Sequence, residues 1–150
     1  MKKIFIASVL VIIATCSFAQ YDDVVKNSEA FSQDSLGVEL SITLKIDSSW
    51  IVYDSIGGQD GPIPFSLSLD ENSPWSIDGV VKPNVNKKFD DLFEMNIYYL
   101  KGQVTYVFKF SNTALKAGQV LSGSYEFMSC NSVSGVCLPP SQYSFSYQVK

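Results

Sequence analysis

The residues of this sequence that could carry out chemistry are two cysteines near its C-terminal end. Cys130 and Cys137 lie in the stretch SCNSVSGVCLPP, with six residues between them and Pro139 and Pro140 close behind. Such a pair can form a structural disulfide, supply part of a metal site, or exchange disulfides with other proteins. A disulfide that closes so short a loop contributes only about 2.5 kcal/mol by chain entropy. The residues alone therefore leave the structural and the exchange roles open.

The composition excludes several other kinds of site. The chain of 150 residues has no histidine, and its net charge at pH 7 is −4. Without histidine there is no Ser-His-Asp or Cys-His catalytic arrangement, and Cys130 and Cys137 alone are too few for the four ligands of structural zinc. An acidic chain that also lacks arginine is a poor candidate for binding nucleic acid. We expect no metal and no cofactor other than the cysteine pair.

The first nineteen residues have the layout of a secretory signal. Lys2 and Lys3 give a basic start, an apolar run covers Ile4–Ala14, and small residues lead to Ala19. The apolar run is shorter than the roughly 20 residues that span a bilayer. We expect cleavage near Ala19-Gln20, export to the periplasm, and no membrane span in the mature chain. A lipid attached at Cys16 is the minor alternative.

The remaining length suits one domain with its own core. Residues 20–37 are polar and mixed, and we interpret them as a leader or an edge strand; residues 38–150 form the predicted domain. Export removes Cys16 with the signal and leaves an even pair of cysteines, which can persist as a disulfide in an oxidising compartment.

Apolar residues recur at every second position in several stretches, which is typical of strands with one buried face. Between them lie turn signals such as Gly57-Gly58 and Asp60-Gly61-Pro62. About seven short antiparallel strands of this kind predict an all-β sandwich. The segment Lys87–Tyr99 is ambiguous and could hold a helical turn before a strand. The alternating stretches are Val38–Asp47, Phe65–Leu69, Val104–Phe110, Leu121–Met128 and Tyr143–Val149, with a further β-rich run at Trp50–Tyr53.

The cysteine pair is predicted to lie at the end of a hairpin. If the alternation of Leu121–Phe127 continues, Cys130 faces away from the core. Pro139 and Pro140 lack N–H donors and push Leu138 before them to extended conformations, so they hold the segment after Cys137 extended while limiting its β-pairing. Both features favour a disulfide that another protein can reach.

The segment YEFMSCNSVSGVCLPP, residues 125–140, resembles the cysteine segment of the N-terminal periplasmic domain of the thiol–disulfide interchange protein DsbD. The resemblance extends to KKFDDLFEMNIYYLKGQVTYVFKF at Lys87–Phe110 and to WIVYDSIGGQDGPIPFSL near Trp50. It implies an immunoglobulin-like antiparallel β-sandwich. It also implies a protein-disulfide reductase or electron-transfer component that passes reducing equivalents to thioredoxin-like periplasmic partners, including cytochrome c maturation factors.

Carried over by this resemblance, Cys130 and Cys137 are the redox-active pair. Cys137 would join the partner in a mixed disulfide and Cys130 would resolve it. The family's mobile cap loop corresponds to FDDLFE, with Phe93 as the shielding residue and Leu92 or Phe89 as alternates. Tyr53 and Pro139 would lie near the site.

Two features depart from the family. The spacing between the cysteines is slightly longer, and no membrane section or thioredoxin-like domain follows Lys150, so we expect a separate membrane protein as electron donor. No neighbouring residue in the sequence acidifies the thiols, so we also expect them to be slow until a partner docks. The competing hypothesis is a non-catalytic exported binding or structural sandwich with an inert hairpin disulfide.

Overall fold

The structure is a computed structural model that describes residues 24–58, 61–91, 94–112 and 115–150. The predicted signal peptide and Cys16 lie outside these residues. The described part of the chain forms strands and turns, and none of its segments is a helix that could cross a membrane. The strands are β1 (Val25–Gln33), β2 (Val38–Ile46), β3 (Trp50–Ile56), β4 (Ser66–Leu69), β5 (Ser76–Val81), β6 (Asn86–Asp90), β7 (Met95–Leu100), β8 (Gln103–Ser111), β9 (Val120–Phe127), β10 (Ser129–Asn131) and β11 (Ser141–Gln148).

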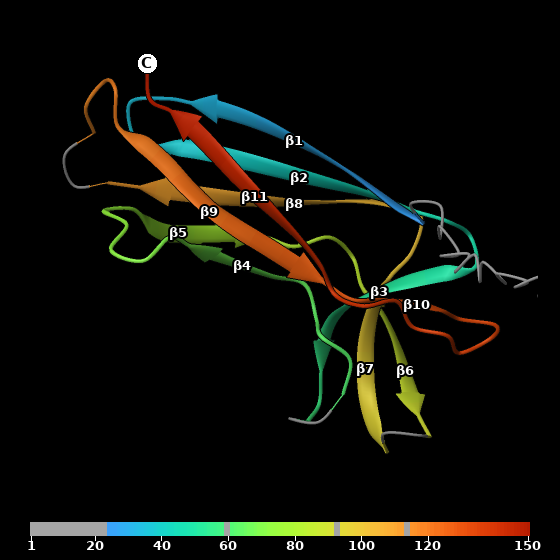
Figure 1. Cartoon of the computed structure of the whole chain (residues 1–150). Coiled ribbons are helices and arrows are strands. Elements are labelled where there is room, and N and C mark those ends of the chain that lie inside the picture. Colours follow the sequence, from blue (N-terminus) through green and yellow to red (C-terminus); the bar gives the residue numbers. More distant parts are fainter. Residues whose placement is uncertain (1–23, 59–60, 92–93, 113–114) are drawn as a thin grey trace, which may run out of the picture.

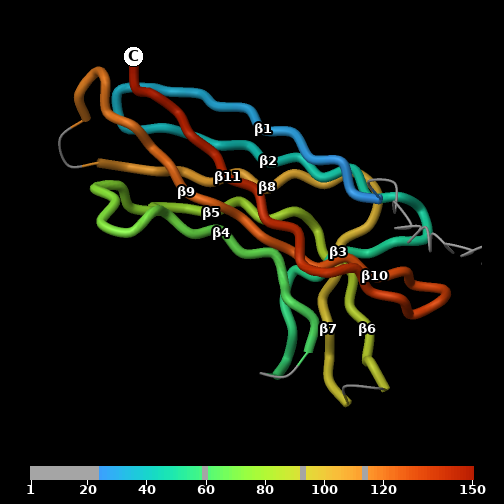
Figure 2. Tube along the Cα trace, in the orientation of Figure 1, coloured from blue at the N-terminus to red at the C-terminus, as the bar shows by residue number. Residues whose placement is uncertain are grey.

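These strands form three antiparallel sheets, in the orders β1-β2-β8-β5, β10-β3-β7-β6 and β11-β9-β4. Figure 1 shows the first and third sheets lying one over the other, while β6 and β7 run away from them at one end. The predicted all-β antiparallel sandwich is confirmed. The C-terminus and the loop after β10 lie at opposite ends of the molecule, as the trace in Figure 2 shows.

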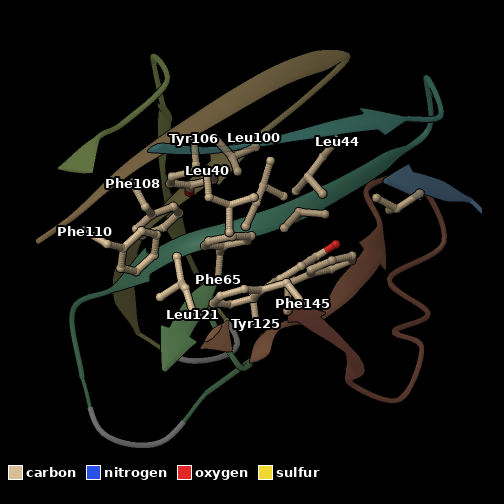
Figure 3. Close-up of a cluster of buried hydrophobic side chains, with 14 of the residues drawn as sticks. Leu40, Leu44, Phe65, Leu100, Tyr106, Phe108, Phe110, Leu121, Tyr125 and Phe145 are labelled. Carbon is tan, nitrogen blue, oxygen red and sulfur yellow. The ribbon is translucent and has the colours of Figure 1, made fainter. Parts of the chain in front are cut away.

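The main core fills the space between the two facing sheets. The predicted alternation of β2 is confirmed, since Val38, Leu40, Ile42, Leu44 and Ile46 are buried while the intervening residues are more exposed. Residues of β8, β9 and β11 contribute much of the rest of this cluster, to which β1, β3 and β7 also add residues, and Figure 3 shows it from close by.

Phe65, just before β4, holds the centre of the main core. Its ring stacks on Tyr106 of β8 at 4.1 Å between centroids and lies 5.9 Å from Tyr125 of β9. Tyr106 and Tyr125 belong to different sheets, so a single ring from a connecting segment bridges the two layers. Aromatic contacts of this kind add to the stability that area burial provides.

A buried polar contact joins the first sheet to the second. Asp54 follows Tyr53 at an irregularity in β3, and its side chain is only 5% exposed. The Tyr106 hydroxyl donates to Asp54 at 2.5 Å, Ser55 donates to the same carboxylate at 3.1 Å, and Lys82 forms an ion pair with it at 3.4 Å. These partners supply the hydrogen bonds and charge that a buried carboxylate requires.

Two segments that the sequence left open are strands. The part of residues 20–37 that the structure describes contains β1, which pairs along its whole length with β2. Within Lys87–Tyr99 the described residues contain no helical turn: Asn86–Asp90 and Met95–Leu100 form the antiparallel pair β6–β7, while residues 92–93 of their connection lie outside the described residues. Cross-strand pairing is a contact between separate segments, so a local helical pattern gives no information about it.

Candidate functional site

The two cysteines lie on a short hairpin at the end of the second sheet. β10 leaves the layer of β9 and pairs with β3, which places Cys130 opposite Ile51. Cys130 and Cys137 are directly opposed in the hairpin, with their Cα atoms 4.0 Å apart, and their sulfurs form a disulfide. Side chains at such a position, between the hydrogen-bonded pairs of an antiparallel ladder, approach each other closely.

Backbone hydrogen bonds flank the disulfide on both sides. The N–H of Leu138 donates to the carbonyl of Ser129 at 2.9 Å, and the N–H of Asn131 donates to the carbonyl of Val136 at 2.8 Å. Leu138 is half-buried and packs against the main core. The hairpin is therefore held by contacts that do not involve the sulfur–sulfur bond.

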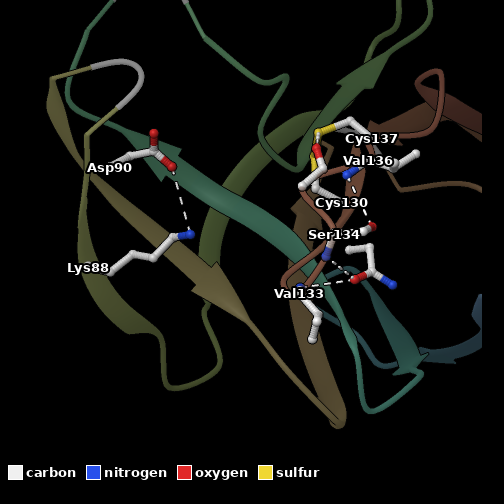
Figure 4. The surroundings of a disulfide bond; sticks show 9 residues. Lys88, Asp90, Cys130, Val133, Ser134, Val136 and Cys137 are labelled. Carbon is white, nitrogen blue, oxygen red and sulfur yellow. Dashed lines mark hydrogen bonds and ion pairs between the residues drawn. A yellow bond between two sulfur atoms is a disulfide. The ribbon is translucent and has the colours of Figure 1, made fainter.

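The two sulfur-bearing residues differ sharply in exposure. Cys130 is 3% exposed, whereas Cys137 is exposed, as are its neighbours Val133 (85%) and Val136 (46%). Thiol–disulfide exchange requires an incoming thiolate to reach one sulfur while the other leaves. Among the described residues, Cys137 is the solvent-exposed member of this disulfide, and Figure 4 shows its position at the hairpin.

Cys130 lies on a second, smaller apolar cluster. Its buried neighbours in this cluster are Ile51, Tyr53 and Ile97, and half-buried Met95 and Tyr99 pack against them. The expectation that Cys130 points away from the main core is confirmed, yet it is not exposed, because this second cluster covers it. The alternation of β9 could not show this, since the chain changes sheets at Met128.

Tyr53 is the polar member of this second cluster. Burial raises the pKa of Tyr53 above its usual value of 10.0, and the negative charge of Asp90 raises it further. The phenol therefore stays neutral near pH 7. Asp90 also forms an ion pair with Lys88 at 3.7 Å, and Figure 4 shows this pair apart from the hairpin, on the opposite edge strand of the second sheet.

The loop between the cysteines is ordered by its own first residue. The side-chain carbonyl of Asn131 accepts hydrogen bonds from the N–H groups of Val133 at 2.9 Å and Ser134 at 3.0 Å. The Asn131 backbone carbonyl accepts from the N–H of Gly135 at 2.9 Å, and Gly135 adopts a positive φ of 74°. Asparagine followed by a left-handed glycine is a common way to close a tight loop.

A second contact holds the loop against the residue that precedes β3. The Ser132 N–H and the Ser132 hydroxyl both donate to the carbonyl of Ser49, at 2.8 and 3.0 Å. Ser49 directly precedes β3, on which Cys130 packs. The loop and the supporting strand thus form one hydrogen-bonded unit.

The other site residues from the sequence analysis have different positions. Tyr53 shares the second cluster with Cys130, and Pro139 is exposed two residues after Cys137. Phe89 is 58% exposed and pairs with Asn96, and by strand alternation it lies on the opposite face of the sheet from Cys130. Leu92 and Phe93 lie outside the described residues, so the shielding role of the FDDLFE segment stays a prediction.

The comparison with protein families decides the affiliation. The family model for the N-terminal part of the thiol:disulfide interchange protein DsbD matches residues 21–148. The chain belongs to this family. The match covers the whole of the described sandwich, including the hairpin with both cysteines.

A solved structure from the DsbD N-terminal family has the same fold. The crystal structure of the Neisseria meningitidis DsbD N-terminal domain in the reduced form matches with a TM-score of 0.54 and 15% sequence identity. The match covers 83% of this chain and 90% of that one. The predicted immunoglobulin-like sandwich is thereby confirmed. A search of curated proteins finds no match.

Sequence reasoning missed the residues that support the cysteines in this family member. The Asn-x-x-x-Gly pattern at Asn131–Gly135 is a readable signal for the loop closure. The contact between Ser132 and Ser49 and the packing of Ile97 beneath Cys130 join segments far apart in the chain. No local pattern predicts such pairs.

Proposed function

We propose that this chain is an exported thiol–disulfide exchange domain that passes reducing equivalents through Cys130 and Cys137 to periplasmic proteins with a thioredoxin-like fold. The single observation that carries the proposal is the asymmetry of the disulfide, with Cys137 exposed and Cys130 buried next to it. Membership in the DsbD N-terminal family supports it. A membrane-bound electron donor recharges the pair under this proposal.

The different exposure of the two cysteines supports a different part for each in the exchange. The Cys137 thiolate attacks the partner's disulfide, one partner sulfur leaves as a thiolate, and a mixed disulfide forms at Cys137. The Cys130 thiolate then attacks the Cys137 sulfur, and the second partner sulfur leaves. Two electrons and two protons pass from the cysteine pair to the partner, which departs as a dithiol.

The deciding experiment is partner trapping with matched cysteine variants. Cys130→Ser leaves the exposed thiol without its resolving neighbour, so we expect it to accumulate mixed disulfides with thioredoxin-fold proteins. Cys137→Ser keeps only the buried thiol and is the control, for which we expect little capture. The adducts are detected by non-reducing electrophoresis and mass spectrometry.

Two results would contradict the proposal. One is equal failure of both variants to capture any thioredoxin-fold protein. The other is a wild-type disulfide that thioredoxin-like donors reduce only when the domain unfolds. Either result would favour the inert hairpin disulfide of a binding or structural domain.

A further inference from the structure

We propose that Asn131 is a positioning residue for the resolving step of the exchange, and this inference rests on the proposed function. It keeps the loop between the cysteines closed while the disulfide is open, so that the Cys130 sulfur remains within reach of Cys137. Asn131 lies beside Cys130 and touches neither the partner nor the reacting sulfurs in this role.

The physical requirement comes from the mixed disulfide. At that stage no covalent bond joins Cys130 to Cys137, and the loop between them is free to open unless other contacts hold it. Attack by Cys130 forms the Cys130–Cys137 bond, breaks the bond between Cys137 and the partner, and releases the partner's sulfur as a thiolate that takes a proton. The rate of this intramolecular step depends on how often the two sulfurs meet in the right geometry.

Asn131 makes more of the loop's hydrogen bonds than any other residue described in it. Its side-chain oxygen accepts from the N–H groups of Val133 and Ser134, its N–H donates to Val136, and its carbonyl accepts from Gly135. All four bonds close the loop across the six residues that separate the cysteines. None of them uses a sulfur atom, so reduction of the disulfide removes none of them.

The ends of the loop are also fixed to the rest of the fold. Ser132 donates twice to the Ser49 carbonyl, which fixes the first half of the loop beside β3. Leu138 packs against the main core and donates to Ser129, which fixes the chain on the outer side of both cysteines. With both ends held, the two hydrogen bonds to the Asn131 side chain add to the backbone bonds that keep the middle of the loop folded.

The test measures the effective concentration of one cysteine at the other, with glutathione as the only redox partner. The protein is equilibrated with mixtures of reduced and oxidised glutathione, and the fractions of dithiol, mixed disulfide and internal disulfide are quantified after acid quenching. Asn131→Ala removes the side-chain acceptor and two hydrogen bonds. We expect the effective concentration to fall roughly five- to thirtyfold, with a matching rise in glutathione mixed disulfide at Cys137. A tenfold fall equals a shift of about 30 mV in reduction potential.

Two variants serve as controls for this measurement. Asn131→Asp retains an acceptor oxygen at the same place, so we expect it to restore most of the effective concentration. Val133→Ala changes an exposed side chain in the same loop and leaves its backbone donor in place, so we expect no change. Circular dichroism of each variant checks that the sandwich is folded.

An unchanged effective concentration in Asn131→Ala would overturn the inference, and so would an equal fall in Asn131→Asp. These outcomes are distinct from failure of the proposed function. The glutathione measurement concerns this chain alone, whereas the proposed function fails when Cys130→Ser captures no thioredoxin-fold protein.

Discussion

The contact between Tyr106 and Asp54 allows a quantitative test of how the sheets are joined. Tyr106→Phe removes one hydroxyl group and leaves the ring, which still stacks on Phe65 at 4.1 Å. The change therefore creates no large cavity, and its effect isolates the hydrogen bond to the buried carboxylate. The remaining partners of Asp54 are the Ser55 hydroxyl and the largely exposed Lys82.

The expected magnitude follows from the burial of both groups. A hydrogen bond to a charged group contributes about 1.5 to 3 kcal/mol, and a buried acceptor that loses its donor also keeps its desolvation cost. Because Ser55 and Lys82 still satisfy part of the carboxylate, we expect a loss of about 2 kcal/mol in the free energy of unfolding. For a domain of this size that corresponds to a fall of roughly 6 to 10 °C in Tm.

Urea unfolding of the oxidised protein, followed by fluorescence, measures this loss. The matched control is Tyr125→Phe, whose hydroxyl accepts from Asn27 and donates to the exposed Glu29, so water can replace part of what is removed. We expect that control to lose about 1 kcal/mol or less. The reasoning is refuted if Tyr106→Phe loses under about 0.5 kcal/mol, or if Tyr125→Phe loses as much.

Three further predictions concern accessibility, backbone packing and pH. After reduction of the folded protein, iodoacetamide should modify exposed Cys137 at least about tenfold faster than buried Cys130, as peptide mass mapping over time will report; equal rates would contradict the exposure described above. Gly123→Ala should destabilise the protein by about 3 kcal/mol, because its Cβ would collide with the backbone of β4 and an aromatic ring of β11, whereas Gly79→Ala, with open space around it, should change thermal stability little. Burial and the Asp54 contact raise the pKa of Tyr106 far above 10 in the folded protein. The stability that comes from keeping this phenol neutral is complete below pH 10, and it is lost as pH rises above 10 because the unfolded chain then ionises first. Urea titrations from pH 9 to 11 should show a free energy of unfolding that falls with pH. Tyr106→Phe should make this slope shallower by up to about 1.4 kcal/mol per pH unit, and an unaltered slope would count against the raised pKa of Tyr106.

The strands of the sandwich were largely predictable because each is a local pattern. The alternation in Val38–Asp47 matches β2 to within one residue, and that in Val104–Phe110 lies inside β8. A strand with one buried face must alternate, so the signal follows directly from the burial. β1 gave a weaker signal, since its residues are mostly exposed or half-buried and it lies at a sheet edge.

The environment of the cysteines was less predictable because it depends on contacts between distant segments. The sequence indicated a hairpin and an orientation away from the main core, and both are found. It could not indicate that Ile51 and Ile97 cover Cys130, since the three residues come from β3, β7 and β10. The sequence could not indicate the hydrogen bond between Tyr106 and Asp54 for the same reason, since the two residues are 52 positions apart in the chain.

The division of the apolar interior into two clusters has a consequence for the motions of the molecule. Cys130 rests on the smaller cluster, and the larger one fills the space between the facing sheets. Segments with few buried contacts open at a lower free energy than the core does. Amide protons of β10 should therefore exchange with solvent well before those of β2. The end of the molecule that bears the sulfurs can then open locally around a bound partner while the aromatic core of the sandwich stays closed.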